Sequence, residues 1–331
     1  MKKHLTPLVC LLSTALFAQS PPLPIIDMHV HANHADFTGI VPMTICVHNE
    51  KWPTVAAGSD WAETLIQASQ NCDYPLVSPP TDEEVMNQSL AIMKKWNIYS
   101  VTSGRLTEVW KDAAPERIIS SFYYRGDGLD PSPDSLRSLF EKGIFEVLGE
   151  IATQYNGISP DDPSLEPYWA FAEALNIPVG IHIGPSPIGA AYLGWGKNRG
   201  RLHSPLQLEE VLVRHPKLRL YVMHAGWPMI DELLTLLWNH PQVYVDISGI
   251  ITDLNEPAFY DYLKKIILVG FGDRIMYGSD QMIWPQLMEI SIQTIESAPF
   301  LSTTEKRDIL YNNAARFLQL SEEEIRRHHG Q

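Results

Sequence analysis

The chain is poor in cysteine, in basic residues and in long apolar runs. Its 331 residues include only 3 cysteines, and only 25 Lys and Arg stand against 39 Asp and Glu, which gives a formal net charge of -14. So acidic a surface repels nucleic acid and anionic lipid. Because 45% of the residues are hydrophobic and only 19% are charged, a disordered tail, a collagen-like fibre and a coiled coil are excluded. We expect a globular protein with a small-molecule substrate and no nucleic-acid partner; a homo-oligomer stays open.

The N-terminal segment has the outline of a secretory signal peptide. Lys2 and Lys3 precede an apolar run from Leu5 to Phe17, and Ala18 follows. This pattern predicts a signal peptide over residues 1–18 and a secreted or periplasmic mature protein. The run is shorter than the ~20 residues of a spanning helix, so an uncleaved anchor is the weaker alternative and no other membrane contact is expected.

Two cysteines remain in the predicted mature chain, Cys46 and Cys72. An oxidising compartment permits them to pair, and a bridge across this spacing would contribute roughly 3 kcal/mol in the chain-entropy model. Two free thiols are the alternative.

Eight short apolar segments, each followed by a segment with helical periodicity, run through the chain. Such units indicate parallel strands that helices cover from outside. We therefore expect an α/β protein with a closed (β/α)8 barrel of the TIM type; a doubly wound open sheet is the alternative. The predicted strands are Ile25–His31, Ile98–Gly104, Arg117–Tyr124, Phe145–Ile151, Pro178–Gly184, Leu218–Ala225, Val243–Ser248 and Arg274–Asp280.

Residues 32–80 break this repeat. They lie between the first strand and the first expected barrel helix, Thr81–Trp96, which opens with the capping residues Thr81 and Glu84. A long segment without clear periodicity is usually functional, so we interpret it as a lid-like insertion over the barrel mouth. Residues 321–331 are expected to form a polar tail.

Ionisable side chains fall at the ends of several predicted strands, where active sites of this barrel lie. Side chains alternate along a strand, so Asp27, His29 and His31 are expected on one face. Burying several imidazoles and carboxylates is costly unless a cation compensates them. Nitrogen and oxygen ligands without cysteine favour an open catalytic site for one or two divalent metal ions, zinc first. The candidate ligands are His29, His31, Glu150, His182, His224 and Asp280.

The order of these motifs resembles the amidohydrolase superfamily, and within it the amidohydrolase-related branch of hydrolases and metal-dependent decarboxylases. The resemblance rests on Ile26–His31, His182, His224, Tyr277–Asp280 and the closing segment Tyr311–Leu318. It covers about residues 25–320 and implies one barrel domain over that range.

The resemblance also implies roles for the candidate ligands. His29, His31 and Asp280 would bind a metal, with His182 as a further ligand, and Asp280 would take the proton from metal-bound water. His224 would either bind a second metal or face the water and substrate. Glu150 departs from the family pattern, because binuclear members commonly have a carboxylated lysine on strand 4. A glutamate can also bridge two metals, so one ion and two ions both stay open.

A metal that lowers the pKa of water to about 7 and polarises a carbonyl favours hydrolysis of an amide, lactone or ester. The first alternative is a decarboxylase of a small aromatic or unsaturated acid, with His224 as proton donor. The second is a non-catalytic binding protein on the same fold.

Candidate residues for substrate contacts follow closely after the predicted strands. Arg125 could bind a substrate carboxylate or pair with Asp127. Tyr155 and Trp284 could stack on a ring or serve packing, and His34 is a candidate pocket residue.

Overall fold

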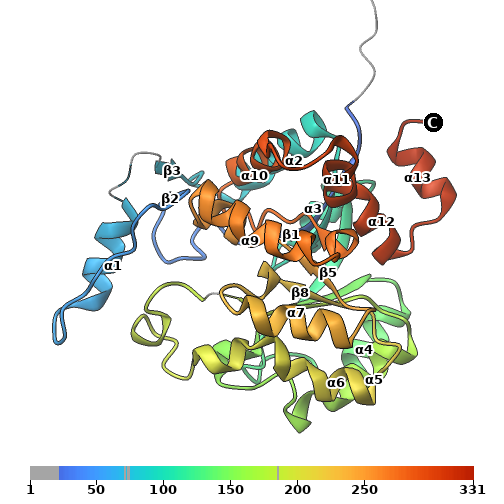
Figure 1. Cartoon of the computed structure of the whole chain (residues 1–331), viewed down its shortest axis with the longest axis horizontal. Helices are drawn as coiled ribbons and strands as arrows, with labels where there is room; N and C mark the ends of the chain where they lie inside the picture. Colours follow the sequence, from blue (N-terminus) through green and yellow to red (C-terminus); the bar gives the residue numbers. More distant parts are fainter. Residues whose placement is uncertain (1–21, 71, 73–74, 185) are drawn as a thin grey trace, which may run out of the picture.

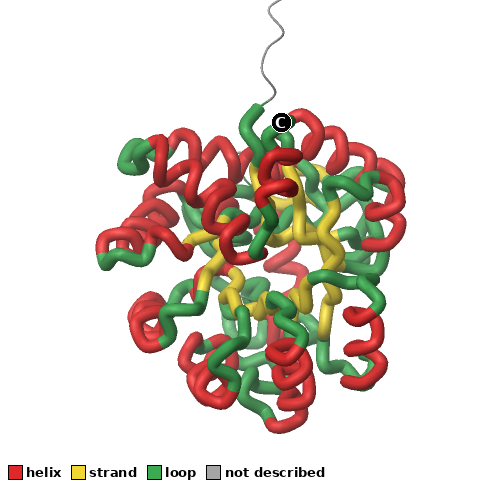
Figure 2. The backbone as a smooth tube through the Cα atoms, turned by 90° about the vertical axis from the view of Figure 1, so that its right-hand side faces the viewer, coloured by secondary structure: helices red, strands yellow, loops and turns green. Residues whose placement is uncertain are grey.

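The protein, seen here in a computed structural model that describes residues 22–70, 72, 75–184 and 186–331, is built on one eight-stranded sheet. All its strand pairs are parallel, in the order β1-β4-β5-β6-β7-β8-β9-β10. Figure 2 shows these strands as a ring surrounded by helices. The predicted (β/α)8 barrel is therefore confirmed, and the doubly wound sheet is excluded.

Each barrel strand begins within two residues of its predicted start, whereas the last four end two to four residues earlier than predicted. The strands are β1 (Ile25–His31), β4 (Ile98–Ser103), β5 (Ile118–Tyr124), β6 (Val147–Ile151), β7 (Val179–His182), β8 (Leu220–Met223), β9 (Tyr244–Asp246) and β10 (Ile275–Met276).

The outer helices follow the strands in turn. Thr81 caps the first of them by accepting a hydrogen bond from the backbone N–H of Glu84 (3.2 Å), as predicted. The helices are α2 (Asp82–Trp96), α3 (Thr107–Ala113), α4 (Pro133–Glu141), α5 (Glu166–Ala174), α6 (Glu209–Arg214), α7 (Ile230–Asn239), α8 (Ile250–Asp253), α9 (Glu256–Leu268) and α10 (Gln286–Ser297).

Backbone hydrogen bonds close the barrel between its last and first strands. The N–H of Met28 donates to the carbonyl of Tyr277 (2.9 Å), and the N–H of Asp280 donates to the carbonyl of His29 (2.8 Å). The segment after β10 therefore runs beside β1, which brings Asp280 to the first-strand histidines.

The pairing of β1 with β4 shifts register between Asp27 and Val30. Such a bulge interrupts the alternation of side chains. The expectation that Asp27 shares a face with both histidines is therefore wrong: Asp27 Oδ1 instead accepts hydrogen bonds from the backbone N–H groups of His29 (3.1 Å) and Ser279 (2.9 Å). The side chains of His29 and His31 still meet, since their Nε2 atoms are 3.0 Å apart.

Three C-terminal helices follow, namely α11 (Thr303–Arg307), α12 (Asn313–Leu318) and α13 (Glu322–His328). In Figure 1, α13 lies at the right and α1 (Trp61–Gln70) at the left. Phe317 of α12 packs into the barrel interior with Ile26 and Tyr221. Residues 321–331, expected as a polar tail, include helix α13, which buries His328 against Tyr99 with ring centroids 3.5 Å apart. Tyr99 belongs to the same apolar cluster as Phe317, which explains why α13 packs here.

The insertion of residues 32–80 has secondary structure of its own. Strands β2 (Thr44–Cys46) and β3 (Pro75–Val77) pair antiparallel, and α1 lies between them in the chain. A disulfide joins Cys46 to Cys72 with a Cα–Cα distance of 5.9 Å, so the two cysteines are bridged. The lid-like role of the insertion stays a prediction.

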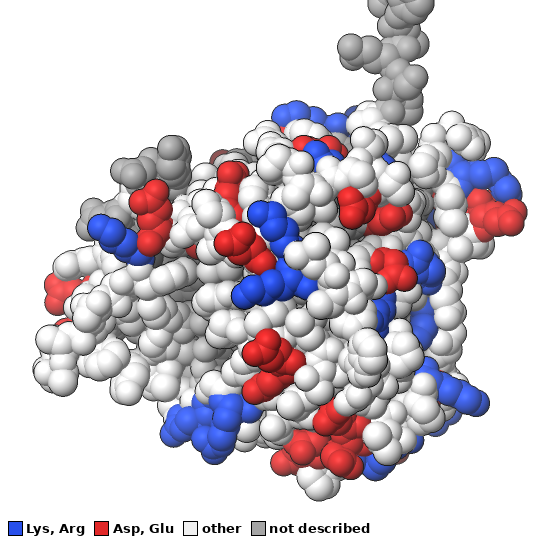
Figure 3. Space-filling model, viewed as in Figure 1, with Lys and Arg blue, Asp and Glu red and all other residues white. Residues whose placement is uncertain are grey.

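The lengths of the helices and the surface charge bear on membrane and nucleic-acid partners. Along the described residues, every helix is too short or too polar to cross a bilayer, and the predicted signal peptide lies outside them. Figure 3 shows acidic and basic side chains interspersed over the visible face, without a broad basic patch.

Candidate metal centre

Six side chains predicted at strand ends meet at one end of the barrel: His29 and His31 of β1, Glu150 of β6, His182 of β7, His224 directly after β8 and Asp280 after β10. All except Asp280 are at most 5% exposed. Asp280 has a side chain that is 20% exposed, so it is the most solvent-accessible of the set.

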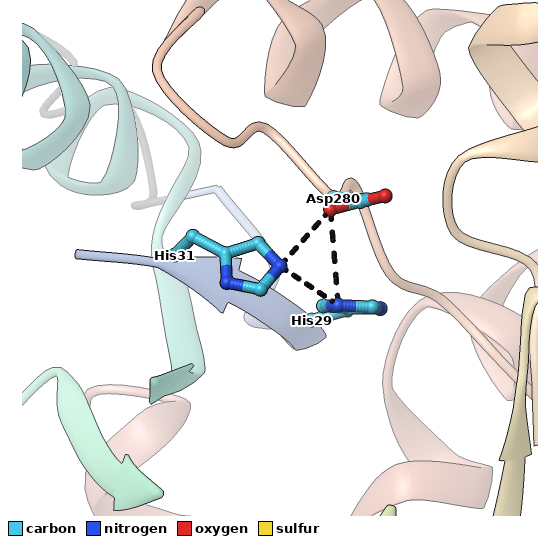
Figure 4. Close-up of side chains that lie close together, drawn as sticks. All are labelled: His29, His31 and Asp280. Atoms are coloured by element: carbon cyan, nitrogen blue, oxygen red, sulfur yellow. Dashed lines mark hydrogen bonds and ion pairs between the residues drawn. The ribbon is translucent and has the colours of Figure 1, made fainter. Parts of the chain in front are cut away.

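The first group joins β1 to the segment after β10. Figure 4 shows His29, His31 and Asp280 pointing toward one another. His31 Nε2 lies 3.0 Å from His29 Nε2 and 3.1 Å from Asp280 Oδ1, and His29 Nε2 lies 3.7 Å from the same oxygen. One ligand atom from each residue therefore lies within 4.8 Å of the others, as binding of a single divalent cation requires.

The second group lies on the adjoining strands. Glu150 Oε1 is 2.5 Å from His182 Nδ1 and 3.9 Å from His224 Nε2, and the two imidazole nitrogens are 3.0 Å apart. Together with His29, Glu150 and His224 form a second set of potential ligands.

Glu150 faces both groups. Its other oxygen, Oε2, is 3.5 Å from Nε2 of His29 and 3.5 Å from Nε2 of His31. One carboxylate thus presents a different oxygen to each pair of imidazoles, which is the arrangement that a ligand shared by two metal ions needs.

Two residues that sequence reasoning missed orient the imidazoles. Asp246, at the end of β9, accepts hydrogen bonds at Oδ1 from the backbone N–H of His224 (2.9 Å) and from the Ser248 hydroxyl (2.6 Å). Ser248 Oγ is 2.7 Å from His29 Nδ1. Such partners fix the ring orientation of metal-binding histidines. The available signal was an aspartate at the same strand edge as the other ligands.

The carboxylates control the charge of the site. Burial alone would lower the pKa of His29, but Asp280, Asp246 and Glu150 raise it well above its ordinary value. Burial alone would raise the pKa of Glu150, yet hydrogen bonding to His182, His224 and His29 holds it well below its ordinary value. The site therefore favours a protonated His29 beside an ionised Glu150.

Two of the candidate ligands have left-handed backbone conformations. The φ angles are 59° for His224 and 50° for Asp280, and such strain costs on the order of 1 kcal/mol per residue. Gly249 approaches both: a Cβ there would lie 3.0 Å from His224 Nδ1 and 3.4 Å from Asp280 Oδ2. The fold thus accepts local strain where side chains must converge.

A cavity of about 1580 Å³ opens above these residues. Arg125 lines it, and Arg125 Nε also lies 3.7 Å from Asp127 Oδ2. Both sequence interpretations of this arginine, a cavity residue and a partner of Asp127, are therefore compatible with its position. Tyr123, which sequence reasoning missed, also lines the cavity and packs edge-on against His31.

The other predicted contact residues also line this cavity. Tyr155 Oη is 3.4 Å from His182 Nε2. Trp284 is only 6% exposed, and its indole N–H donates to the carbonyl of Met43 (2.9 Å), so it holds the insertion against the barrel. His34 Nδ1 is 2.7 Å from Asp82 Oδ2.

His203 is a further buried histidine that the sequence left without a site role. It is 3% exposed, its ring centroid is 5.3 Å from that of His182, and its Nε2 bonds to Asn198 Oδ1 (2.7 Å). It lines a neighbouring pocket of about 310 Å³. Its burial could not be predicted from the sequence, because His203 lies outside every strand.

The donor set fits a divalent metal ion. Asp280 Oδ1 and Asp246 Oδ2 are buried and make no hydrogen bond within the described part of the chain, although imidazole nitrogens lie 3.1 Å and 3.5 Å from them. Imidazole nitrogen and carboxylate oxygen suit zinc and related transition metals.

Comparisons with known proteins agree with this geometry. Residues 26–320 match the family model described as amidohydrolase. The curated protein fluG of Emericella nidulans is 19% identical in an alignment 256 residues long, which covers 70% of this chain but only 29% of fluG. The chain thus spans less than a third of the length of that relative.

Solved structures share the fold. An uncharacterised TIM-barrel protein from Bordetella bronchiseptica is 17% identical with a TM-score of 0.61, covering 93% of this chain and 100% of its own. The 5-carboxyvanillate decarboxylase of Sphingomonas paucimobilis is 14% identical (TM-score 0.54), and a probable 2-pyrone-4,6-dicarboxylic acid hydrolase of Acinetobacter baumannii is 15% identical (TM-score 0.56). Both matches cover 90% of this chain and 100% of the other.

Proposed function

The chain belongs to the amidohydrolase family, which includes hydrolases and decarboxylases, and we propose that it is a hydrolase. It adds water to the carbonyl carbon of an amide, lactone or ester with the help of two divalent metal ions, zinc by preference. We propose further that it acts outside the cytoplasm, because the Cys46–Cys72 disulfide suits an oxidising compartment.

The position of Glu150 carries this proposal. Its Oε2 faces the pair His29 and His31, and its Oε1 faces the pair His182 and His224. Two-metal sites serve hydrolytic displacement, since two ions can stabilise the attacking and the leaving oxygens together. With one ion, His182 would be a further ligand of that ion and His224 would face the water and substrate; the second oxygen of Glu150 directed at His182 favours two ions.

The candidate ligands would be shared between the two ions as follows. His29, His31 and Asp280 would hold one ion, His182 and His224 would hold the other, and Glu150 would be a ligand to both. When bound, zinc-type ions lower the pKa of water to about 7 and polarise a carbonyl.

Asp280 moves the proton. Burial alone would raise its pKa, but the imidazoles of His29 and His31 hold the pKa of Asp280 well below its usual range. It is therefore a carboxylate at neutral pH and can accept a proton from the attacking water. A weakly basic carboxylate also releases that proton readily to the leaving nitrogen or oxygen.

Two cavity residues orient the substrate. Burial and the nearby Glu150 raise the pKa of Tyr155 well above its ordinary value, so its hydroxyl stays protonated. It can donate a hydrogen bond to the oxygen on which negative charge develops. Arg125 can bind a carboxylate of the substrate in bidentate fashion.

Metal analysis together with a substrate panel tests the proposal. Gently purified mature protein should carry about two equivalents of transition metal and release a new carboxylate from lactones, amides or esters. Release of carbon dioxide from aromatic or unsaturated acids instead would identify a decarboxylase, and absence of bound metal would overturn the proposal.

A matched pair of variants tests the bridging role. Glu150→Gln should reduce the bound metal to about one equivalent, because one carboxylate oxygen becomes an N–H donor. Glu146→Gln changes a half-exposed side chain one residue before β6, paired with Lys111, and should retain two equivalents. Equal stoichiometry in both variants would contradict the shared-ligand arrangement.

A further inference from the structure

The cavity above the metal centre is much larger than the centre itself requires. Its volume of about 1580 Å³ exceeds the roughly 300–1,000 Å³ of ordinary small-molecule pockets. A small lactone or a single aromatic acid would leave most of this space filled with water. The excess volume therefore points to a substrate with a large additional group.

The insertion supplies an apolar wall of this cavity. Phe37, Trp52 and Leu65 all line it, and Phe37 and Trp52 are 43% and 45% exposed. Figure 3 shows that the surface over α1, at the left, is mostly uncharged. Contiguous exposed apolar surface usually marks a binding site. Because Glu150 and Asp280 line the same cavity, a molecule that lies on this apolar wall can extend to the candidate metal centre.

The insertion also contacts the loop that follows β7. The rings of Trp61 and Tyr192 stack with centroids 4.2 Å apart. Leu65 approaches the same loop so closely that a Cβ at Gly189 would lie 2.7 Å from its Cδ1. Figure 1 shows α1 projecting beside this yellow-green loop. The two segments therefore meet at the cavity, which residues of both line.

Aromatic side chains connect this enclosure to the metal centre. The ring of Trp195 is 5.7 Å from that of Tyr155, and the ring of Tyr155 is 5.1 Å from that of His182. Both Trp195 and Tyr155 line the cavity. An apolar chain attached to the reacting carbonyl thus has a continuous surface to lie on.

The enclosure is covalently braced. The disulfide joins Cys46, at the end of β2, to Cys72, just beyond α1, and the Trp284 indole holds the Met43 carbonyl from the barrel side. Bracing of this kind lowers the ordering cost of binding.

We propose that residues 32–70 of the insertion form an apolar compartment for a long hydrophobic acyl group of the substrate, with Trp52 and Phe37 as specificity-determining residues. This inference rests on the proposed function, since the acyl carbonyl must lie at the metal centre.

Binding of linear alkanoyl hydroxamates, from acetyl to decanoyl, to the zinc-loaded mature protein tests the inference without turnover. The hydroxamate group chelates the metal, and the alkyl chain probes the compartment. Burial of each methylene should lower Kd roughly three- to fourfold, so that octanoyl hydroxamate binds at least a hundredfold more tightly than the acetyl compound, as measured by calorimetry.

Trp52→Ala should reduce this chain-length dependence at least tenfold between the acetyl and decanoyl members. Its Kd for acetyl hydroxamate should stay unchanged, which also shows that the variant is folded. Trp238→Ala is the matched control, because Trp238 on α7 is 78% exposed and outside the cavity lining.

The outcomes separate the two proposals. Equal Kd values along the series in the wild-type protein would overturn the compartment and leave the metal-centre proposal standing. Failure of every member to bind would overturn the metal centre itself. If Trp52→Ala altered only self-association or retention on lipid vesicles, the apolar wall would be a docking surface and the inference would be wrong.

Discussion

Replacement of Asp280 by asparagine separates proton transfer from metal binding. In Asp280→Asn the oxygen that lies 3.1 Å from His31 Nε2 and 3.7 Å from His29 Nε2 can be kept. The side chain loses its negative charge and its ability to accept a proton. The other five candidate ligands are unaltered, so the metal content should stay close to that of the wild-type protein.

The expected loss of turnover follows from the role of a positioned base. Proton transfer by such a group contributes roughly 10²- to 10⁴-fold to rate, equivalent to about 3–5 kcal/mol. We expect kcat of Asp280→Asn to be lower than that of the wild-type protein by a factor within this range. KM should change only a few-fold, because the cavity walls and Arg125 are unaffected.

The assay compares kcat, KM and metal content of the zinc-loaded variant on whichever lactone, amide or ester the wild-type protein hydrolyses. Asp253→Asn is the matched control, since Asp253 lines the same cavity but is outside both ligand groups; its kcat should stay within tenfold of wild type. If Asp280→Asn kept more than a tenth of wild-type kcat, the assignment of the base would be wrong. A parallel loss of metal would show that the residue acts mainly as a ligand.

Three more predictions concern the surroundings of the centre. Arg125→Ala should raise KM about 10- to 100-fold for substrates with a carboxylate, equivalent to a charged hydrogen bond of ~1.5–3 kcal/mol, while neutral substrates should be unaffected in the same kinetic assay. The double change Cys46→Ser and Cys72→Ser opens a loop with a sequence separation of 26 and should weaken the insertion by up to about 3.5 kcal/mol, seen as faster proteolysis within residues 47–70. Burial lowers the pKa of His328, stacked on Tyr99, to about 4. The unfolded chain then binds the extra proton, so the free energy of unfolding should fall by up to about 3 kcal/mol between about pH 6.5 and 4. Chemical unfolding of His328→Phe should show a smaller fall; an identical pH dependence would refute this account.

The strand starts could be predicted because apolar β-branched runs and helical periodicity alternate regularly. The strand ends could not, because the chain leaves the ladder where it forms the site. Strand β10 covers only Ile275–Met276, whereas the prediction extended to Asp280. Beyond β10 the backbone bonds to β1 through Met28 and Asp280, a tertiary contact that no local pattern encodes.

The candidate ligands were predictable because they fall at the ends of predicted strands, whereas the residues that orient them were not. His29 and His31 mark β1 by their spacing, and Asp280 closes a recognisable segment. Asp246 is a lone aspartate at the end of a short strand, and its importance comes only from contacts with His224 and Ser248. Helix α1 and the antiparallel pair of β2 and β3 were missed for a similar reason, since the disulfide and the Trp284–Met43 hydrogen bond hold them more than local periodicity does.

The same buried charges connect the stability of the barrel to its chemistry. Glu150 and Asp246 are at most 5% exposed, and buried carboxylates without compensation would destabilise the fold by several kcal/mol. In the protein alone, the raised pKa of His29 and the lowered pKa of Glu150 allow protons to supply that compensation. A divalent ion supplies more charge at the same place and displaces those protons, so metal binding and folding stabilise each other. Loading with the cation should therefore raise the stability of the barrel above that of the metal-free protein.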